Sequence, residues 1–413
     1  MGALDFNLKY FDLAQNNVLE INKIVSPELE LIVVIPAYKE PDIVEAISSL
    51  FPTSLEDNQY EIIVVLNHPE TATKEVIEMT EISFTKIEQW KRSNKNQGQN
   101  LLVFKEKLPT KHAGVGLARK IGMDAAVNRF KQINKPHGIV MTYDGDCDST
   151  PDHLAKVLTY FQENKNILAA SIHYEHPFQN IEDKIYQQNI IDYELHLRAY
   201  IQWEKYIGLP YAFQTIGSSM AVRSAAYTRK GGMNKRKAGE DFYFLHKFTH
   251  DGTFGEIKTT TVFPSCRISD RVPFGTGRAM QEAREQGREM LTYNPSSFLL
   301  MKKLIDNLDF IYTENSIDSL ELDSRLMFYL NTIHFSDHII SCFQNSASLE
   351  SFKKRFFQWM DAFQMMKYLH HMRDHHFPNV IPLAAANELM VLFQKQVCIT
   401  PTEALLKMRS QNG

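Results

Sequence analysis

Continuous apolar runs separated by helix-like segments constrain the first 150 residues more than any other feature of the chain. The run from Leu29 to Ile35 stops at Pro36, and similar runs lie in "YEIIVVLNHP", "LLVFKE" and "GIVMTYDGD". Such runs are typical of strands buried on both faces, as in a parallel sheet. The segments between them have helical spacing. The sequence therefore predicts a doubly wound α/β domain, with a mostly parallel sheet flanked by helices.

The pattern changes farther along the chain. Between about residues 150 and 275 the alternation loosens, although "IEDKIYQQNIIDYELHLRAYIQWEKYIG" has helical spacing and "NILAASIHYE" fits a strand. From about residue 280 onward the periodicity is helical and no strand pattern is convincing. We therefore divide the chain into an N-terminal leader (1–28), an α/β domain (29–279) and an α-helical C-terminal extension (280–413).

Composition and charge exclude several classes of protein. The net charge of −4 argues against non-specific binding to nucleic acid. The four cysteines are far apart and form no CxxC pair, which is typical of a reducing compartment. The N-terminal residues include acidic side chains and do not resemble a secretory signal. No run of about 18 uncharged apolar residues occurs, so we expect a cytoplasmic protein whose membrane contact is at most peripheral.

The stretch "MTYDGDCDSTPDHL" (141–154) places Asp144, Asp146 and Asp148 at every second position, directly after an apolar run. Carboxylates so close together repel one another unless water or a cation lies between them. In open α/β sheets, ligands bind beyond the carboxyl ends of the strands, where this stretch is expected. Because residues two apart on a strand point the same way, Asp144 and Asp146 are predicted to bind one Mg²⁺ or Mn²⁺ together with substrate phosphate oxygens.

Two other interpretations of these aspartates remain open. An EF-hand calcium loop also begins D-x-D-x-D, but it requires Gly at its sixth position and Glu at its twelfth. This chain has Ser149 and Ala155 there. The second alternative is a solvated acidic turn before the helix that starts near Pro151, which would need no ligand.

Five segments occur in an order and spacing that resemble the family 2 glycosyltransferases with the GT-A fold. They are "VVIPAYKEP", "GVGLARKIGMDAA", "YDGDCDSTPDHL", "IGSSMAVRSAAYTRKGGM" and "AGEDFYFLHK", spread over roughly residues 30–275. The resemblance implies a Rossmann-like GT-A fold. It also implies transfer of a sugar from a nucleotide-diphosphate donor to an acceptor hydroxyl, with inversion and with help from Mn²⁺ or Mg²⁺. The acceptor, whether glycan, lipid or small molecule, is not specified by the resemblance.

The resemblance also assigns roles to residues of this chain. It implies that Asp146 binds the metal, that Asp144 reaches the metal or the donor ribose, and that Asp241 is the catalytic base with Glu240 in support. The residues expected to line the base and ribose of the donor are Pro36, Ala37, Tyr38 and Glu40. Asn67 stands where the family usually has an acidic residue, and it is expected to bond a base edge. A histidine that serves as third metal ligand in some relatives has no match, so Asp270 or water would replace it.

Basic residues near glycines suggest sites for the donor phosphates. "KHAGVGLARK" could admit phosphate to backbone N–H groups, with Lys111 and Arg119 adding charge; the alternative is a tight loop with an exposed basic turn. "CRISDRVPFGTGRA" (266–279) contains Arg267, Arg271 and Arg278 between glycines. We interpret it as a lid over the donor diphosphate, with Arg271 binding the donor; the alternative is a solvated linker.

Glycosyl transfer requires a base, because an acceptor hydroxyl is a poor nucleophile until its proton is removed. Asp241 suits this role if burial or a neighbouring carboxylate raises its pKa. The alternative for "GED" is an ordinary helix N-terminus, where acidic residues favour the helix dipole.

Two other functions remain as alternatives for the whole chain. A sugar-phosphate nucleotidyltransferase usually has a glycine-rich loop after its first strand, and "IPAYKEP" has no glycine. A non-catalytic nucleotide-sugar-binding protein of the same fold would share the binding residues. The histidines in "YLHHMRDHHF" lack the glutamate of an HExxH zinc site, and we expect a partly exposed histidine-rich helix there.

Overall fold

The computed structural model describes residues 4–14, 19–250, 252–268, 280–281, 289–314, 316 and 320–412. Residue contacts divide the chain into two units. The first comprises residues 1–180, 215–281 and 412–413, and the second comprises residues 181–214 and 282–411. The two units are described separately below.

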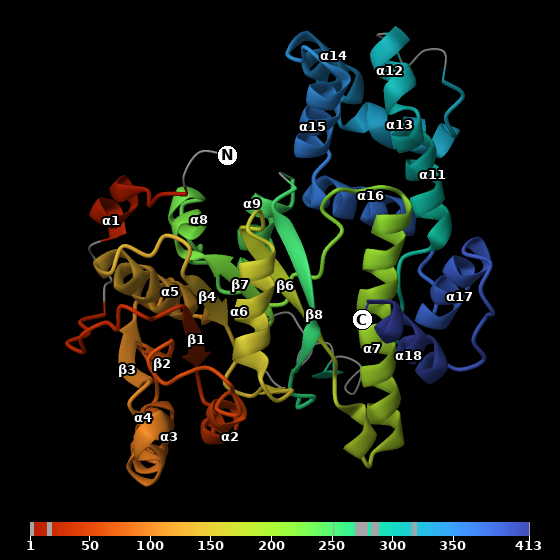
Figure 1. Ribbon diagram of the computed structural model, residues 1–413. Coiled ribbons are helices and arrows are strands. Elements are labelled where there is room, and N and C mark those ends of the chain that lie inside the picture. Colours follow the sequence, from red (N-terminus) through yellow and green to blue (C-terminus); the bar gives the residue numbers. More distant parts are fainter. Residues whose placement is uncertain are drawn as a thin grey trace. The chain divides into compact units, whose positions relative to one another are not determined.

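The first unit is built on an eight-stranded sheet with the order β3-β2-β1-β4-β7-β6-β8-β5. Strands β3, β2, β1 and β4 run parallel to one another, and β7 is antiparallel to both β4 and β6. Strand β8 is parallel to β6 and antiparallel to β5. Helices flank this sheet (Figure 1), which confirms the predicted α/β class.

The strands of this unit are β1 (Leu31–Ala37), β2 (Tyr60–Pro69), β3 (Leu101–Leu108), β4 (Ile139–Thr142), β5 (Asp148–Ser149), β6 (Ala169–Tyr174), β7 (Met220–Arg223) and β8 (Phe254–Phe263). Its helices are α1 (Leu8–Ala14), α2 (Ile43–Ser49), α3 (Lys74–Ser93), α4 (Lys95–Gly98), α5 (Val115–Gln132), α6 (His153–Glu163), the 3₁₀ helix η2 (Phe178–Asn180), α8 (Ser224–Arg229) and α9 (Glu240–Thr249).

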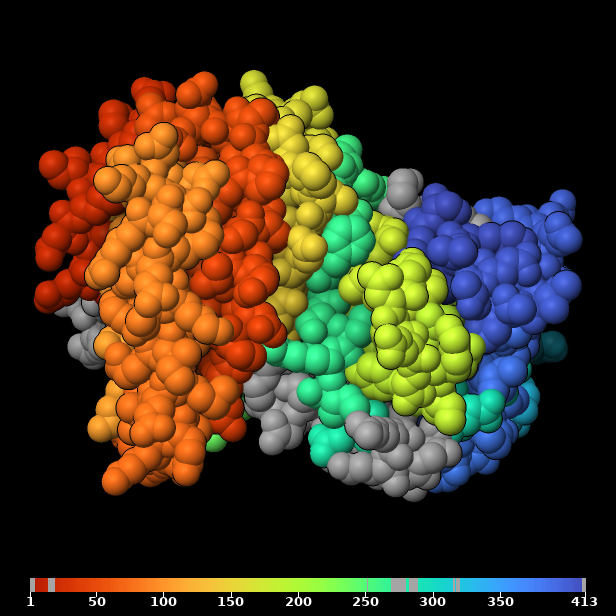
Figure 2. Space-filling model, turned by 90° about the horizontal axis from the view of Figure 1, so that it is seen from below, coloured from red at the N-terminus to blue at the C-terminus, as the bar shows by residue number. Residues whose placement is uncertain are grey.

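The apolar runs form the centre of this sheet. All seven residues of β1 are buried, as are all four of β4, because helices cover the sheet there. Helix α5 packs closely against β1 and β2. A Cβ at Gly122 would lie 2.4 Å from a methyl carbon of Val34, so glycine is required for this approach. Helix α3 packs against β2 and β3, and it forms part of the surface seen in Figure 2.

The second unit is helical. Its helices are α7 (Lys184–Tyr206), α11 (Pro295–Asp306), α12 (Leu308–Glu314), α13 (Ser324–Thr332), α14 (Phe335–Gln344), α15 (Leu349–Trp359), α16 (Ala362–His375), α17 (Pro382–Leu392) and α18 (Pro401–Asn412). Trp203 of α7 stacks on Phe298 and donates a hydrogen bond of 3.0 Å to the Ala385 carbonyl. The buried carboxylate of Glu194 pairs with both Arg198 and Arg409.

Three details differ from the expectations. Strand β4 ends at Thr142, so Asp144 and Asp146 lie in the following turn and strand alternation does not set their directions. Strand β8 was not predicted. Residues 181–214, which include α7, group with the helical unit rather than with the α/β unit. The predicted limits 29–279 and 280–413 place this segment in the α/β domain, and they remain a prediction. Within the described residues, no helix is both long and apolar enough to span a membrane.

Candidate active site

Several of the predicted site residues of the first unit, from the segments around Arg119, Asp144 and Glu240, meet around the turn after β4. The N–H of Cys147 donates to the Asp144 carbonyl at 3.2 Å, which closes the turn that carries Asp144 and Asp146. At the end of β4, the Thr142 hydroxyl donates to the Gly217 carbonyl at 2.5 Å. This contact fixes the start of the turn against the segment that leads into β7.

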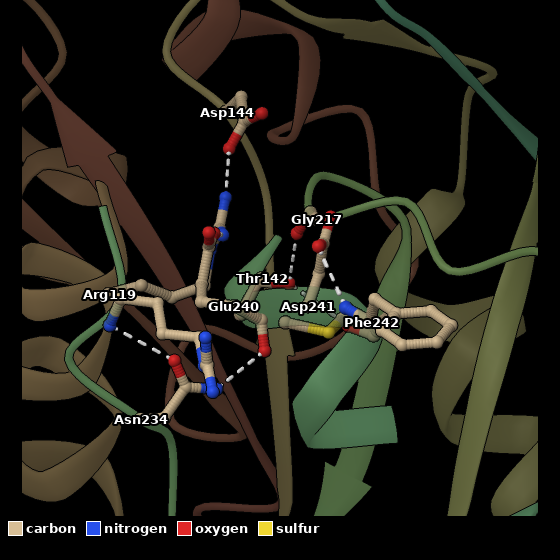
Figure 3. Close-up of polar contacts among 10 residues, drawn as sticks. Arg119, Thr142, Asp144, Gly217, Asn234, Glu240, Asp241 and Phe242 are labelled. Carbon is tan, nitrogen blue, oxygen red and sulfur yellow. Dashed lines mark hydrogen bonds and ion pairs between the residues drawn. The ribbon is translucent and has the colours of Figure 1, made fainter. Parts of the chain in front are cut away.

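Arg119 connects this turn to the "GED" segment (Figure 3). Its Nη2 lies 2.7 Å from Oδ1 of Asp144, and its Nη1 pairs with Glu240. The side chains of Arg119 and Glu240 are only 2% and 3% exposed. A buried charge is tolerated only when it is paired, so Arg119 holds the two acidic segments at a fixed separation.

The "GED" segment begins helix α9. Gly239 precedes the helix with φ +67°, a conformation that glycine adopts readily, and Glu240 is the first helical residue. The amide of Asn234 donates to the Glu240 carbonyl at 2.9 Å. Adjacent helical residues do not share a face. Glu240 therefore pairs with Arg119, whereas the Asp241 carboxylate accepts the N–H of Phe242 at 2.8 Å.

Burial shifts the ionisation of two site carboxyls. Burial raises the pKa of Asp241, and Asp144 raises it further, while Arg119 and the Phe242 N–H lower it. Burial followed by Asp144 also raises the pKa of Asp146, against the lowering effect of Arg267. A raised pKa is the property that a general base needs if it is to accept a proton near neutral pH.

Three glycines allow the backbone to approach these side chains. A Cβ at Gly217 would lie 2.8 Å from the guanidinium nitrogens of Arg119. At Gly116 it would lie 2.1 Å from the Arg236 carbonyl, and at Gly145 it would lie 3.1 Å from a methylene of Glu40. A side chain at Gly116 would therefore clash with backbone, and one at Gly217 would displace the guanidinium of Arg119.

The predicted donor-binding segment follows β1. Pro36 and Ala37 end this strand and are buried, and Tyr38 is partly exposed. The side-chain amide of Asn67 donates to the Ala37 carbonyl at 2.9 Å. Its amide nitrogen therefore holds the end of β1 in this structure, and its expected contact with a base edge remains a prediction.

A contact that the sequence did not predict joins Glu40 to the turn that carries Asp144 and Asp146, called the aspartate turn below. Arg267 follows β8 and pairs with Glu40, and its Nη2 lies 2.9 Å from Oδ2 of Asp146. The arginines of 266–279 predict a lid, and that pattern does not indicate a pair between Arg267 and Glu40. Residues 269–279 lie outside the described residues, and with them Asp270, Arg271 and Arg278.

Lys111 is exposed, and its predicted donor contact remains a prediction.

Possible metal ligands are few. Among the described residues, no group of three or more His, Cys, Asp or Glu side chains is arranged to hold a metal ion. Asp144 and Asp146 are the two carboxylates predicted to bind a metal, and in this structure each is paired with an arginine. A metal held here would need further ligands from a substrate or from water.

Comparison with known proteins identifies the domain. Residues 32–229 match the family model described as glycosyl transferase family 2. These residues form a family 2 glycosyltransferase domain. The match contains both the segment after β1 and the aspartate turn, whereas "GED" and Arg267 lie beyond its end. The resemblance predicted from the sequence motifs is thus confirmed, and the enzyme is a glycosyltransferase.

Other comparisons add little to this assignment. A search of curated proteins found no match. The structure of TarS residues 1–349 from S. aureus in complex with UDP-GlcNAc is 12% identical, with a TM-score of 0.40, covering 93% of this chain and 89% of that one. The mannosyltransferase PcManGT from Pyrobaculum calidifontis, in complex with GDP-Man and Mn²⁺, is 13% identical, with a TM-score of 0.37, covering 98% and 93%. Such distant likeness carries no argument about this glycosyltransferase.

Proposed function

We propose that this glycosyltransferase moves a sugar from a nucleotide-diphosphate donor to an acceptor hydroxyl, with inversion at the sugar carbon and with help from a divalent metal. One observation supports this most directly. Arg119, which lies within the family 2 domain, joins the aspartate turn to the start of α9, where Asp144 raises the pKa of Asp241. The carboxylate proposed to bind the metal or ribose and the carboxylate proposed as base therefore lie close together.

Asp241 is the proposed catalytic base. In the reaction, the acceptor oxygen forms a bond to the sugar carbon while Asp241 takes the hydroxyl proton. The bond from that carbon to the phosphate oxygen breaks, and its electron pair leaves with the nucleoside diphosphate. A single displacement of this kind inverts the carbon. Glu240 supports the base indirectly, because it fixes Arg119, which in turn lowers the pKa of Asp241.

The donor nucleotide is proposed to bind at the segment after β1. Pro36, Ala37 and Tyr38 would contact the base and ribose, together with Asn67. Glu40 is buried next to this segment and paired with Arg267, which supports a role in shaping the pocket. The donor phosphates are proposed to be attracted by the positive charges of Lys111, Arg119 and Arg271. Asp144 is proposed to contact the donor ribose or the metal.

Asp144 and Asp146 fit a Mn²⁺ or Mg²⁺ ion whose other ligands are donor phosphate oxygens and water. Carboxylate oxygens suit these ions, which commonly use only one or two carboxylates from the protein. The side chain of Asp146 is 20% exposed, so its charge is poorly solvated and a cation beside it is favoured. When bound, such an ion would stabilise the negative charge that develops on the leaving diphosphate.

The helical residues 280–413 are proposed to help hold the acceptor, which is a hydroxyl compound of unspecified class. The domain limits 29–279 and 280–413, the cytoplasmic location and an at most peripheral membrane contact are proposals of the same kind. No nucleic acid is proposed as a partner, because the net charge is −4.

The test is a thermal-shift screen of UDP and GDP sugars with and without Mn²⁺, since a ligand that binds only the folded state raises the apparent stability. Donors that raise the melting temperature are then incubated with the enzyme and Mn²⁺. The proposal expects release of nucleoside diphosphate from one of them. Formation of a nucleoside triphosphate and a sugar phosphate from donor and pyrophosphate would instead identify a nucleotidyltransferase. Binding without any cleavage would identify a non-catalytic binding protein.

A further inference from the structure

Arg267 lies between two acidic segments of the proposed donor site. Nη2 of its guanidinium both pairs with Glu40 and lies 2.9 Å from Oδ2 of Asp146, and Nη1 lies 4.0 Å from Oδ2 of Asp42. Glu40 belongs to the segment after β1, where the nucleotide is proposed to bind. Asp146 belongs to the turn that would hold the metal. Arg267 thus connects the proposed nucleotide and metal positions with one positive charge.

The three carboxylates near Arg267 are shielded from water to different degrees. The side chain of Glu40 is 7% exposed, against 20% for Asp146 and 66% for Asp42. Losing an ion pair costs most where solvent cannot replace the partner. Arg267 should therefore keep its contact with Glu40 more firmly than its contact with Asp146.

We propose that Arg267 is an internal cation that competes with the divalent metal for Asp146 until the donor diphosphate arrives. This inference rests on the proposed metal-dependent function. A metal ion at Asp146 would be repelled by the guanidinium 2.9 Å from the same carboxylate, so metal binding alone must displace Arg267. The donor diphosphate gives the displaced guanidinium a new anionic partner, and arginine binds such oxygens well in pairs.

The consequence is that metal and donor bind cooperatively. If diphosphate makes room for the metal by attracting Arg267, then the metal must strengthen diphosphate binding by the same factor. Couplings of this type are commonly about 5-fold to 150-fold. Arg267 therefore has two partners in turn: the carboxylate of Asp146 before the donor binds, and the donor diphosphate afterwards.

The experiment measures Mn²⁺ affinity by calorimetry in the wild type, Arg267→Gln and Arg267→Lys, each without nucleotide and with saturating UDP or GDP. Arg92→Gln is the matched control, because Arg92 is exposed in the last turn of α3. For Arg267→Gln we expect tighter Mn²⁺ binding without nucleotide, by about tenfold, and a coupling to nucleotide reduced by a similar factor. Arg267→Lys keeps the charge but not the paired donors, so its Mn²⁺ affinity should stay near wild type while the coupling falls. Arg92→Gln should match the wild type in its Mn²⁺ affinity and in its coupling to nucleotide.

Each outcome has a definite meaning. If Arg267→Gln keeps the wild-type Mn²⁺ affinity and coupling, the inference is overturned while the proposed function stands. If the wild type binds neither nucleotide in the presence of Mn²⁺, the proposed function fails and the inference fails with it. Thermal unfolding of each variant checks its fold. Should Arg267→Gln not fold, an unchanged coupling in Arg267→Lys overturns the inference, and a loss of several-fold supports it.

Discussion

Nη2 of Arg119 lies 2.7 Å from Oδ1 of Asp144, while Nη1 of the same guanidinium pairs with Glu240. The two carboxylates come from segments that are far apart in the sequence, and the arginine that joins them is almost completely buried. The contact has both a structural and a chemical consequence. It compensates the buried charge of Glu240, and it lowers the pKa of the neighbouring Asp241.

Replacing Arg119 with methionine should destabilise the α/β unit strongly. The substitution leaves the carboxylate of Glu240 buried without its partner, and breaking a buried pair in this way typically costs about 3–5 kcal/mol. The free energy of unfolding from urea denaturation provides the measurement. In the double variant Arg119→Met/Glu240→Gln, most of the lost stability should return, because the buried group is then neutral and the other partner, Asp144, is exposed enough to be solvated. Equal stability of the single and double variants would contradict this account of the pair.

Replacing Asp241 with asparagine should abolish most of the activity without weakening donor binding. General base catalysis typically contributes about 10²- to 10⁴-fold, so donor cleavage should slow by that factor. The affinity for UDP or GDP in the presence of Mn²⁺ should stay within about twofold, because the amide keeps the size of the carboxylate. The exposed Asp57→Asn is the control for the chemical change. Full activity in Asp241→Asn would remove the base assignment.

Activity should fall at low pH with a midpoint above the ordinary carboxyl range of about 4. Asp241 accepts a proton only when it is ionised, and burial raises its pKa, so the rate rises as the pH increases through that raised value. The measurement is the pH profile of kcat/KM for donor cleavage. Arg119→Gln should move the acidic limb to higher pH, because Arg119 lowers the pKa of Asp241, whereas Arg119→Lys should move it less. An acidic limb that does not move in either variant would show that another group controls it.

Gly217→Ala should reduce activity by displacing Arg119. The added Cβ would lie 2.8 Å from the guanidinium nitrogens, and the buried side chain is held on two sides and cannot move away freely. Misplacing catalytic groups by about 1 Å can cost about 100-fold, so we expect a loss of about 10- to 100-fold in donor cleavage. Ser218→Ala removes a hydroxyl at the next position and serves as control. If Gly217→Ala and Ser218→Ala cleave the donor at similar rates, the activity does not depend on the present position of Arg119.

The sequence predicted the fold where burial is uniform. Strands β1, β2 and β4 are apolar almost throughout, because helices cover both faces of the parallel part of the sheet. Strand β8 was missed because Phe254–Phe263 mixes exposed and buried positions irregularly and contains Lys258 and three threonines. Its register with β6 also shifts between Ile172 and His173, so no simple alternation marks it.

The candidate site was predictable only in its local parts. The aspartate turn and "GED" are short patterns that can be recognised in the sequence. The pairs Arg119–Glu240 and Arg267–Glu40 join residues 121 and 227 positions apart, and such partners are brought together by the fold. The sequence identified Arg119 as a phosphate-binding candidate and Arg267 as part of a lid. It gave no signal that either arginine is paired with the acidic residues of the site.

Glu204 in the helical unit should make stability depend on pH. Burial raises the pKa of Glu204 to about 8, and a hydrogen bond from Tyr200 only partly offsets this effect. One carboxyl oxygen, Oε1, has no hydrogen-bond partner within the described residues. The folded protein therefore keeps this group protonated at pH values where the unfolded chain, with a pKa near the ordinary 4.5, has already ionised. The unfolded state gains from ionisation in this window, so the free energy of unfolding should fall as the pH rises from about 4.5 to about 8.

Glu204→Gln should remove this dependence, because glutamine has nearly the same shape and does not ionise. The slope attributable to Glu204 is at most about 1.4 kcal/mol per pH unit, and over the whole window the variant should gain a few kcal/mol relative to the wild type. The free energy of unfolding can be measured by urea denaturation monitored through tryptophan fluorescence, since Trp203 is adjacent to Glu204. The exposed Glu350→Gln controls for loss of an acidic group elsewhere in the unit. If the difference between Glu204→Gln and the wild type is the same at pH 5 and pH 8, Glu204 is already ionised in the folded state and its carboxylate must be stabilised by groups other than Tyr200.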